Sequence, residues 1–263
     1  MKRNSFFAAL LILVVAAISF EGCEKEEEVQ AEVSPSKVSL YKGEKETVKI
    51  TNSKDQVSYE VGNYFVASCN LIVETSGVSN NYTYSVVGNH VGNTYVRFSG
   101  GIDLDVPIEV MAKYHTYEEP NLDFDDTRDS VKAKFGEPTL EDVPLNDTTK
   151  VYVYYINENN TMLVNFYTYN EKVGSYALSF SDESIFDELE PYLIERYEKF
   201  GETSTLKAFM NAESMEDATL IVSLSKSDSG YMVLYTNPET LMVPDKNDIS
   251  ALMSCLEMIR MSE

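Results

Sequence analysis

The chain has 263 residues, with 43 Asp and Glu against 21 Lys and Arg, and a formal net charge of −22 at pH 7. This charge argues against nucleic acid as a partner, because phosphate binding requires clustered Lys and Arg. It also disfavours docking on an anionic membrane through charge, while the length allows one or two domains with hydrophobic cores.

The N-terminal residues have the organisation of an export signal. Lys2 and Arg3 form a positive segment, and residues 6–20 are apolar apart from Ser19. The apolar run is short for a membrane-spanning helix and suits the hydrophobic region of a signal peptide. We therefore expect a signal peptide over residues 1–22.

Cys23 follows this segment directly after Gly22. A small residue before a cysteine, at the end of a hydrophobic region, resembles the lipobox of bacterial lipoproteins. The resemblance implies cleavage before Cys23, a diacylglycerol on its thiol and a further acyl chain on its amine. Because each buried methylene contributes ~0.8 kcal/mol, two or three acyl chains hold a protein firmly at a membrane. The alternative is a secreted protein with a chance cysteine near its cleavage site.

Residues 23–30 continue as an acidic tether that contains Glu24 and the run Glu26–Glu28. An acidic run directly after the anchor cysteine resembles the signal that sends lipoproteins of some Gram-negative bacteria to the outer leaflet. The resemblance implies a lipid-anchored protein of the cell outer membrane that is exposed at the surface. Without it, the run is a solvated, disordered tether.

Residues 31–112 alternate apolar and polar side chains in six or seven short segments. Turn sequences such as Lys42-Gly43-Glu44 and Gly100-Gly101 separate these segments. One buried face per strand at this spacing predicts an all-β sandwich. Residues 33–44 resemble the opening of bacterial Ig-like domains, and residues 92–94 and 106–110 resemble their last hairpin and closing strand. The resemblance implies a stalk or spacer.

Residues 113–122 are polar and contain Pro120, which predicts a linker. Residues 123–263 then predict an α+β domain. A helix is expected from Asp126 or Thr127 to Gly136, and a second from Ser181 or Asp182 to Phe200. Strands are expected after each helix, at residues 151–156, 162–169, 174–180, 218–224 and 231–236.

The two helices end in similar sequences, Lys134-Phe135-Gly136-Glu137 and Lys199-Phe200-Gly201-Glu202. We interpret this as a duplication with units at about 123–180 and 181–240, followed by a helix at 245–261. Chance similarity of two helix-and-hairpin units is the alternative.

The segment from Thr127 to Pro138 resembles a turn-to-helix signature of small α/β envelope domains. These domains are related to β-lactamase inhibitor proteins and to lipoproteins that assist outer-membrane assembly. The expected fold class is thus multidomain: an all-β Ig-like sandwich followed by an α+β domain, in which tandem repeats pack helices on an antiparallel sheet.

No catalytic set is evident in the sequence. His90 and His115 are the only histidines, and Cys69 and Cys255 are expected to be two buried thiols rather than a disulfide. The densest carboxylate cluster, around Asp126, has Arg128 where a calcium loop requires glycine, so it reads as the start of a helix. We therefore expect no enzyme activity, no metal and no cofactor.

A tyrosine-rich hairpin is the most suggestive candidate surface. Tyr152 and Tyr154 share one face of a predicted strand, and Tyr167 and Tyr169 share a face of the next. Exposed tyrosines stack on sugar rings or anchor protein partners. The alternative is that they pack under the helices, because strands favour aromatic residues.

These observations predict a lipid-anchored, non-catalytic envelope protein that binds a glycan or a protein partner and contacts the membrane through its N-terminal lipid. One alternative is an inhibitor-like or envelope-assembly lipoprotein that faces the periplasm. A less favoured alternative is a hydrolase that uses unmarked carboxylates.

Overall fold

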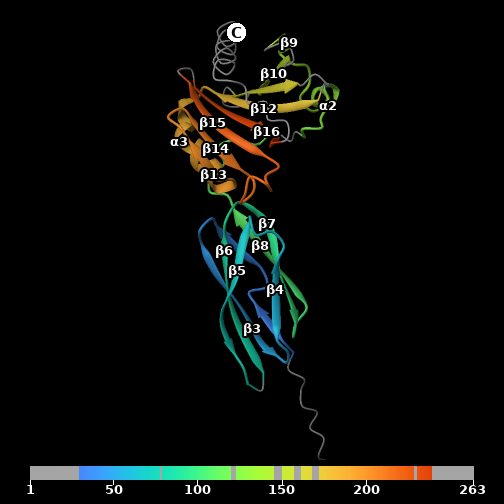
Figure 1. Ribbon diagram of the computed structural model, residues 1–263, viewed down its shortest axis with the longest axis vertical. Helices are drawn as coiled ribbons and strands as arrows, with labels where there is room; N and C mark the ends of the chain where they lie inside the picture. The colour runs from blue at the N-terminus through green and yellow to red at the C-terminus, as the bar shows by residue number, and fades with distance from the viewer. Residues whose placement is uncertain are drawn as a thin grey trace, which may run out of the picture.

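The computed structural model describes residues 30–77, 79–119, 123–144, 150–156, 161–167, 172–227 and 230–238. These residues are mostly in β-strands, which form two four-stranded sheets followed by one eight-stranded sheet (Figure 1). Within the described residues, no helix has the length and apolar character needed to cross a membrane.

The first part of the chain is a sandwich of two sheets. One sheet has the order β1 (Glu32–Ser34), β3 (Lys45–Ser53), β6 (Asn80–Gly88), β5 (Ala67–Thr75). The other has the order β2 (Val38–Tyr41), β8 (Leu104–Met111), β7 (Gly92–Gly100), β4 (Val57–Val61). β2 pairs with β8 in parallel, and the remaining pairs are antiparallel.

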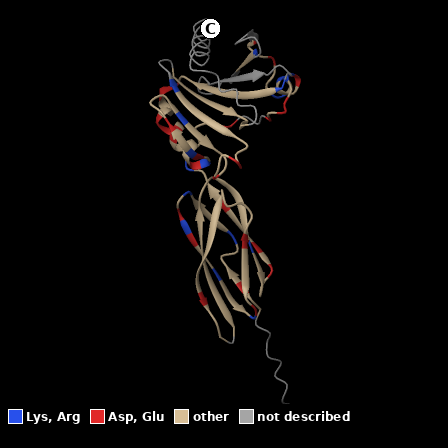
Figure 2. Ribbon diagram, in the orientation of Figure 1, with Lys and Arg blue, Asp and Glu red and all other residues tan. Residues whose placement is uncertain are grey.

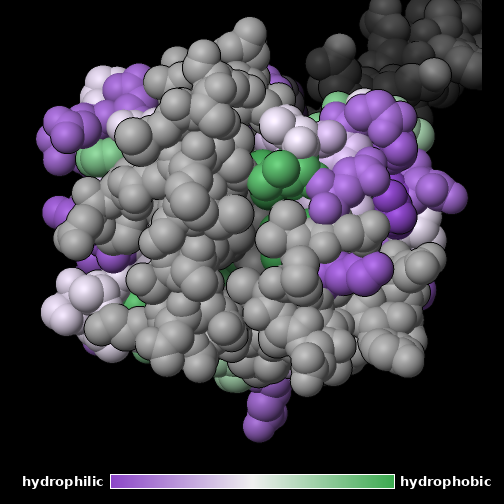
Figure 3. Space-filling model, turned by 90° about the horizontal axis from the view of Figure 1, so that it is seen from above, coloured by the Kyte–Doolittle hydropathy of each residue, from purple (hydrophilic) through white to green (hydrophobic). Residues whose placement is uncertain are grey.

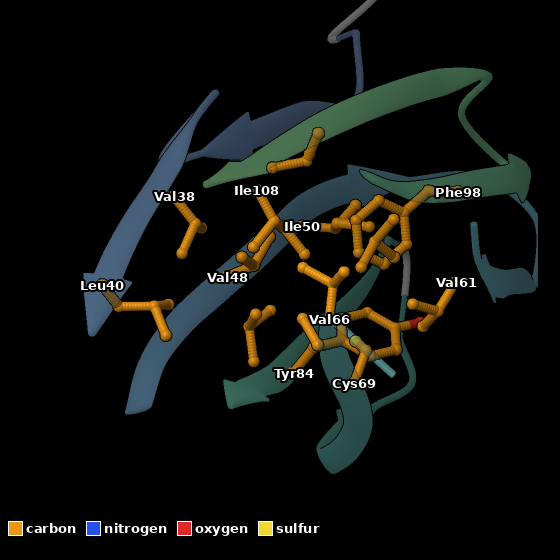
Figure 4. Packing of buried hydrophobic residues seen from close by; sticks show 14 of the residues in the cluster. Val38, Leu40, Val48, Ile50, Val61, Val66, Cys69, Tyr84, Phe98 and Ile108 are labelled. Carbon is orange, nitrogen blue, oxygen red and sulfur yellow. The ribbon is translucent and has the colours of Figure 1, made fainter. Parts of the chain in front are cut away.

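The core of the sandwich lies between its two sheets. Alternate residues of each strand point inward, as period-two patterning dictates, and Figure 4 shows them meeting from both sheets. Ile50 and Phe98 have no exposed surface, and the ring of Tyr84 lies 4.8 Å from that of Phe98, measured between centroids. Apolar burial of this kind is the main stabilising contribution to the sandwich.

The second part of the chain is built on the eight-stranded antiparallel sheet. Its strand order is β13 (Glu198–Glu202), β14 (Leu206–Met210), β15 (Ile221–Ser227), β16 (Gly230–Thr236), β12 (Val173–Phe180), β11 (Thr161–Tyr167), β10 (Lys150–Ile156), β9 (Leu140–Pro144). All eight residues of the central strand β12 are buried, so both of its faces are covered.

In the described residues, two short α-helices and one 3₁₀ turn accompany this sheet: α2 (Arg128–Phe135), η1 (Glu183–Ile185) and α3 (Phe186–Arg196). α2 begins where the Thr127 hydroxyl accepts a hydrogen bond from the Ser130 amide, and it ends at Gly136, whose φ is 84°. Both are ordinary terminal signals of a helix, and the sequence predicts both.

The predicted fold class is wrong. An all-β Ig-like sandwich followed by a helix-packed α+β tandem repeat does not describe this chain, which is predominantly β throughout, with only two short α-helices in the described residues. β13 occupies residues 198–202, where the sequence pattern predicts the end of a helix. Gly136 therefore ends a helix, whereas Gly201 lies within a strand that pairs with β14.

The physical reason is that a short apolar stripe does not distinguish a helix from a strand. Tyr197 is extended at φ −130° and ψ 156°, which ends α3 one turn earlier than the stripe suggests. The edge strands β9 and β13, and β14 beside β13, have no strong alternation in sequence, and pairing with neighbouring strands forms them. The helix predicted at 245–261, and Cys255 within it, lie outside the described residues.

Candidate binding pocket beside helix α3

The sandwich and the eight-stranded sheet meet at the C-terminal end of α3. The last carbonyls of a helix have no partner within the helix, and here groups of the sandwich supply donors. The Val91 amide donates to the Glu195 carbonyl at 2.8 Å, and Lys42 Nζ donates to the Ile194 carbonyl at 2.8 Å. The end of this helix is therefore completed by residues distant in sequence.

The buried side chain of Glu195 fixes the segment that leaves the sandwich. Its carboxylate accepts from the Lys113 amide at 2.9 Å and from the Tyr114 amide at 3.1 Å. Arg196 Nη1 forms an ion pair with the same carboxylate, and Arg196 Nη2 donates to the Tyr114 carbonyl at 3.3 Å. Residues that the sequence suggests to be a linker are thus held by charge-assisted hydrogen bonds.

A pocket of about 690 Å³ opens beside this attachment. It lies between residues 115–119 and α3, which contributes Tyr192 and Arg196.

Charged residues of both signs also gather around α3 and β13 (Figure 2), where Lys199 Nζ lies 3.0 Å from Glu190 Oε1. On the end of the molecule seen from above in Figure 3, the described surface is mainly hydrophilic.

Glu119 is one of the charged residues that line the pocket. Its Oε2 accepts a 2.8 Å hydrogen bond from the Tyr197 hydroxyl, and hydrogen bonds from the Tyr192 and Tyr235 hydroxyls also favour the carboxylate. Burial raises the pKa of this carboxyl, although the Tyr197 hydrogen bond and the positive charge of Arg196 act in the opposite direction. Loss of hydration on burial is therefore the largest influence on the pKa of the Glu119 carboxyl.

The aromatic rings of the pocket are covered by other groups of the protein. The Arg196 guanidinium lies 3.6 Å from the centroid of the Tyr192 ring, and the Tyr117 ring lies 4.2 Å from it. The Tyr117 hydroxyl is 2.6 Å from that of Tyr235. The pocket therefore offers charged and polar groups rather than an open aromatic face.

The structure places the four predicted tyrosines differently. Tyr152 and Tyr154 are 3% and 2% exposed and belong to the core cluster of the second part, so a ligand has no access to their rings. The backbone of Tyr167 lies in β11, but its side chain and all of Tyr169 are outside what the structure describes. A binding role for Tyr167 and Tyr169 stays a prediction.

The acidic cluster lies at the start of α2. Asp126 accepts from the Ser130 hydroxyl at 3.0 Å and pairs with Lys134 at 2.6 Å, and Asp125 pairs with Lys172 at 2.6 Å. Lysine ammonium groups thus neutralise these carboxylates. Across the described residues, no group of three His, Cys, Asp or Glu side chains is arranged to hold a metal ion.

Cys69 is a buried free thiol in the sandwich core, and burial raises its pKa to about 12. The thiolate, which is the reactive form of cysteine, is therefore strongly disfavoured.

The sequence alone does not single out Glu119 or Glu195 as functional or structural residues, since both look like surface glutamates in acidic surroundings.

His90 lies at the junction on the sandwich side. Its ring stacks on Phe65 with centroids 4.1 Å apart, Nδ1 is 2.9 Å from the Phe65 carbonyl, and Nε2 is 3.4 Å from Glu198 Oε2. Burial lowers the pKa of His90 below 6.5, and Lys42 acts in the same direction, while the Phe65 carbonyl and Glu198 oppose the shift. The neutral ring is thus the form that the junction favours.

This lowered pKa predicts a pH-dependent stability. Below pH 6.5 the unfolded chain binds a proton at His90 more readily than the folded chain, so stability is lost as the pH falls from 6.5 to the lowered folded pKa. Urea unfolding measured above and below pH 6.5 should show that the free energy of unfolding falls more with decreasing pH in the wild type than in His90→Gln. Glu198→Gln should make this fall larger, because it removes a charge that raises the His90 pKa. Equal falls in the unfolding free energy of the wild type and His90→Gln would contradict the prediction.

Comparisons with known proteins give no family. No family model matches the sequence, and no curated protein does. Among solved structures, domains 4 and 5 of the S-layer protein SbsC align with a TM-score of 0.28 and 24% identity, over 32% of this chain and 46% of that chain. Domains 5–6 of SbsC align with a TM-score of 0.28 and 14% identity, over 81% of this chain and 85% of that chain. Likeness at this level establishes no shared function.

Proposed function

We propose that the protein is a lipid-anchored, non-catalytic binding protein of the cell envelope, held at the outer membrane through Cys23 and exposed at the surface. The sandwich serves as a spacer, and the second part, with the pocket beside α3, carries the binding surface. The ligand is a glycan or a protein partner.

The position of the sandwich carries this proposal. β2 and the parallel strand β8 both run toward the junction, where Lys42 and Lys113 contact α3. β1 pairs with the far end of β3, so the described chain begins at the end of the sandwich remote from the eight-stranded sheet (Figure 1). An anchor attached before β1 would thus hold the second part away from the membrane.

The contacts at the junction support a stiff spacer. The helix end, the Glu195 carboxylate and the segment at residues 113–114 are joined by hydrogen bonds from both parts of the chain. A binding surface held at a fixed distance from its anchor reaches past neighbouring surface molecules without losing orientation. This arrangement suits contact with an external ligand.

Cys23→Ser tests the anchor. Cells that express the variant and are fed labelled fatty acid should show no label on the protein, and the protein should leave the membrane fraction, because the thiol that accepts the lipid is absent. Cys255→Ser is the matched control and should keep the label. Undiminished labelling of Cys23→Ser would refute the anchor, and resistance of the wild type to protease added to intact cells would refute surface exposure.

A further inference from the structure

The eight-stranded sheet has a first face, on which the described α-helices pack. Tyr176 and Leu178 of β12 point to this face, where they share a core cluster with Val131 of α2 and Leu189 of α3. Successive residues of a strand point to opposite sides of a sheet. The residues between Tyr176 and Leu178, and their neighbours on β16, therefore define a second face that these two helices do not cover.

The central part of the second face is nevertheless buried. Ala177 of β12 points to it, together with its cross-strand partner Leu234 and with Met232 of β16. Ala177 has no exposed surface, and Met232 and Leu234 are 1% and 3% exposed. None of the three belongs to either core cluster of the described residues. Apolar side chains so well shielded indicate a cover that comes from outside the described ranges.

The covered area extends across the middle of the sheet. Val151 and Val153 of β10 alternate with the tyrosines of the first-face cluster, and both are buried. β11 and β12 lie between β10 and β16, so the cover is roughly 15 Å wide at about 4.8 Å per strand. It becomes thinner toward β15, where Ser223, the partner of Leu234, is partly exposed.

The chain that follows the described residues is suited to form this cover. The described part ends at residue 238, directly after β16, and residues 239–263 follow. Residues 245–261 carry an apolar stripe at helical spacing, made of Ile249, Leu252, Met253, Leu256 and Ile259. A helix over these residues would be about 25 Å long, which exceeds the width of the cover. Residues 239–244 reach about 20 Å when extended, so the segment can turn back over the sheet.

We propose that the C-terminal segment at residues 245–261 packs its apolar stripe on the second face of the eight-stranded sheet, over Ala177, Met232 and Leu234. Burial of apolar surface from both sides stabilises the contact. A face closed by the chain itself is not open to a partner, so the ligand of the binding protein proposed above approaches from another side, such as that of α3. The contact itself does not depend on that binding role.

Methyl NOE spectroscopy of the purified wild-type protein tests the contact without any variant. With the methyl groups of Leu and Met labelled, Leu252 and Leu256 should give cross-peaks to Met232 and Leu234. Cross-peaks to Leu189 on the first face instead, or no cross-peaks to either face, overturn the proposal. In a mixture of differently labelled molecules, cross-peaks between molecules would assign the cover to a second copy and overturn it equally.

Met253→Asp and Met258→Asp are a matched pair of variants. Met253 belongs to the apolar stripe, whereas Met258 lies on the opposite side of the same predicted helix. Met253→Asp should lower the midpoint of thermal unfolding by at least about 5 °C, because it places a charge against an apolar face. Met258→Asp should shift the midpoint by no more than about 2 °C.

Equal shifts of the unfolding midpoint in the two variants overturn the proposal. Such a result, with fatty-acid labelling at Cys23 intact, would exclude the C-terminal segment as the cover of the sheet but leave the anchored binding protein standing.

Discussion

Replacing Glu195 by alanine should lower the free energy of unfolding by about 3–5 kcal/mol, because it removes one partner of a buried ion pair. Glu195 is 5% exposed, and its carboxylate holds Arg196 and the backbone amides of Lys113 and Tyr114. The variant would leave all of these donors without their acceptor in a site that water barely reaches. Urea unfolding monitored by circular dichroism measures the change.

Two further variants show whether the carboxylate itself is responsible. Glu195→Gln keeps one acceptor oxygen, so its loss should be smaller than that of Glu195→Ala. Asp187→Ala removes an exposed carboxylate of the same helix and should change the unfolding free energy by no more than about 0.5 kcal/mol. Equal effects of Glu195→Ala and Asp187→Ala would mean that the junction does not depend on Glu195.

Phe209→Ala should cost about 3–5 kcal/mol of stability through loss of apolar burial and creation of a cavity. Phe209 lies on β14, has no exposed surface and belongs to the core cluster that includes Leu189 and Leu193 of α3. The removed ring therefore lies between the sheet and the helix that borders the pocket. Equilibrium unfolding of the variant gives the cost directly.

The matched control removes the same atoms from the same sheet. Phe200 lies on β13, next to β14, but is 42% exposed. Phe200→Ala should cost much less than Phe209→Ala, because much of its ring is already in water. Similar losses in both variants would contradict the burial that distinguishes these two phenylalanines.

The predicted tyrosine surface shows what an alternating sequence pattern can and cannot predict about a strand. Period-two spacing correctly places Tyr152 and Tyr154 on one face of a strand, and both side chains are buried in the same cluster. Alternation reports which residues share a face, but it does not report which face is covered. What covers a face depends on elements elsewhere in the chain, here including Val131 of α2 and Leu189 of α3.

The ends of α2 follow from local sequence signals, whereas the end of α3 depends on residues distant in the chain. The start of α2 at Thr127 and its end at Gly136 follow from signals within a few residues, and the sequence predicts both. α3 ends at Arg196, although the apolar stripe continues to Phe200. Its final carbonyls bond to Lys42 and Val91 of the sandwich, and no local pattern contains these partners.

By itself, the sequence determined the helix α2, the inward faces of the sandwich strands and the acidic character of the chain. Only the tertiary structure decided that residues 198–202 form a strand, that the predicted linker is held by Glu195, and that Glu119 lines a pocket. The reason is the range of the interactions. Caps and alternating side chains act between near neighbours, whereas buried carboxylates take their donors, and edge strands their pairing, from residues far along the chain.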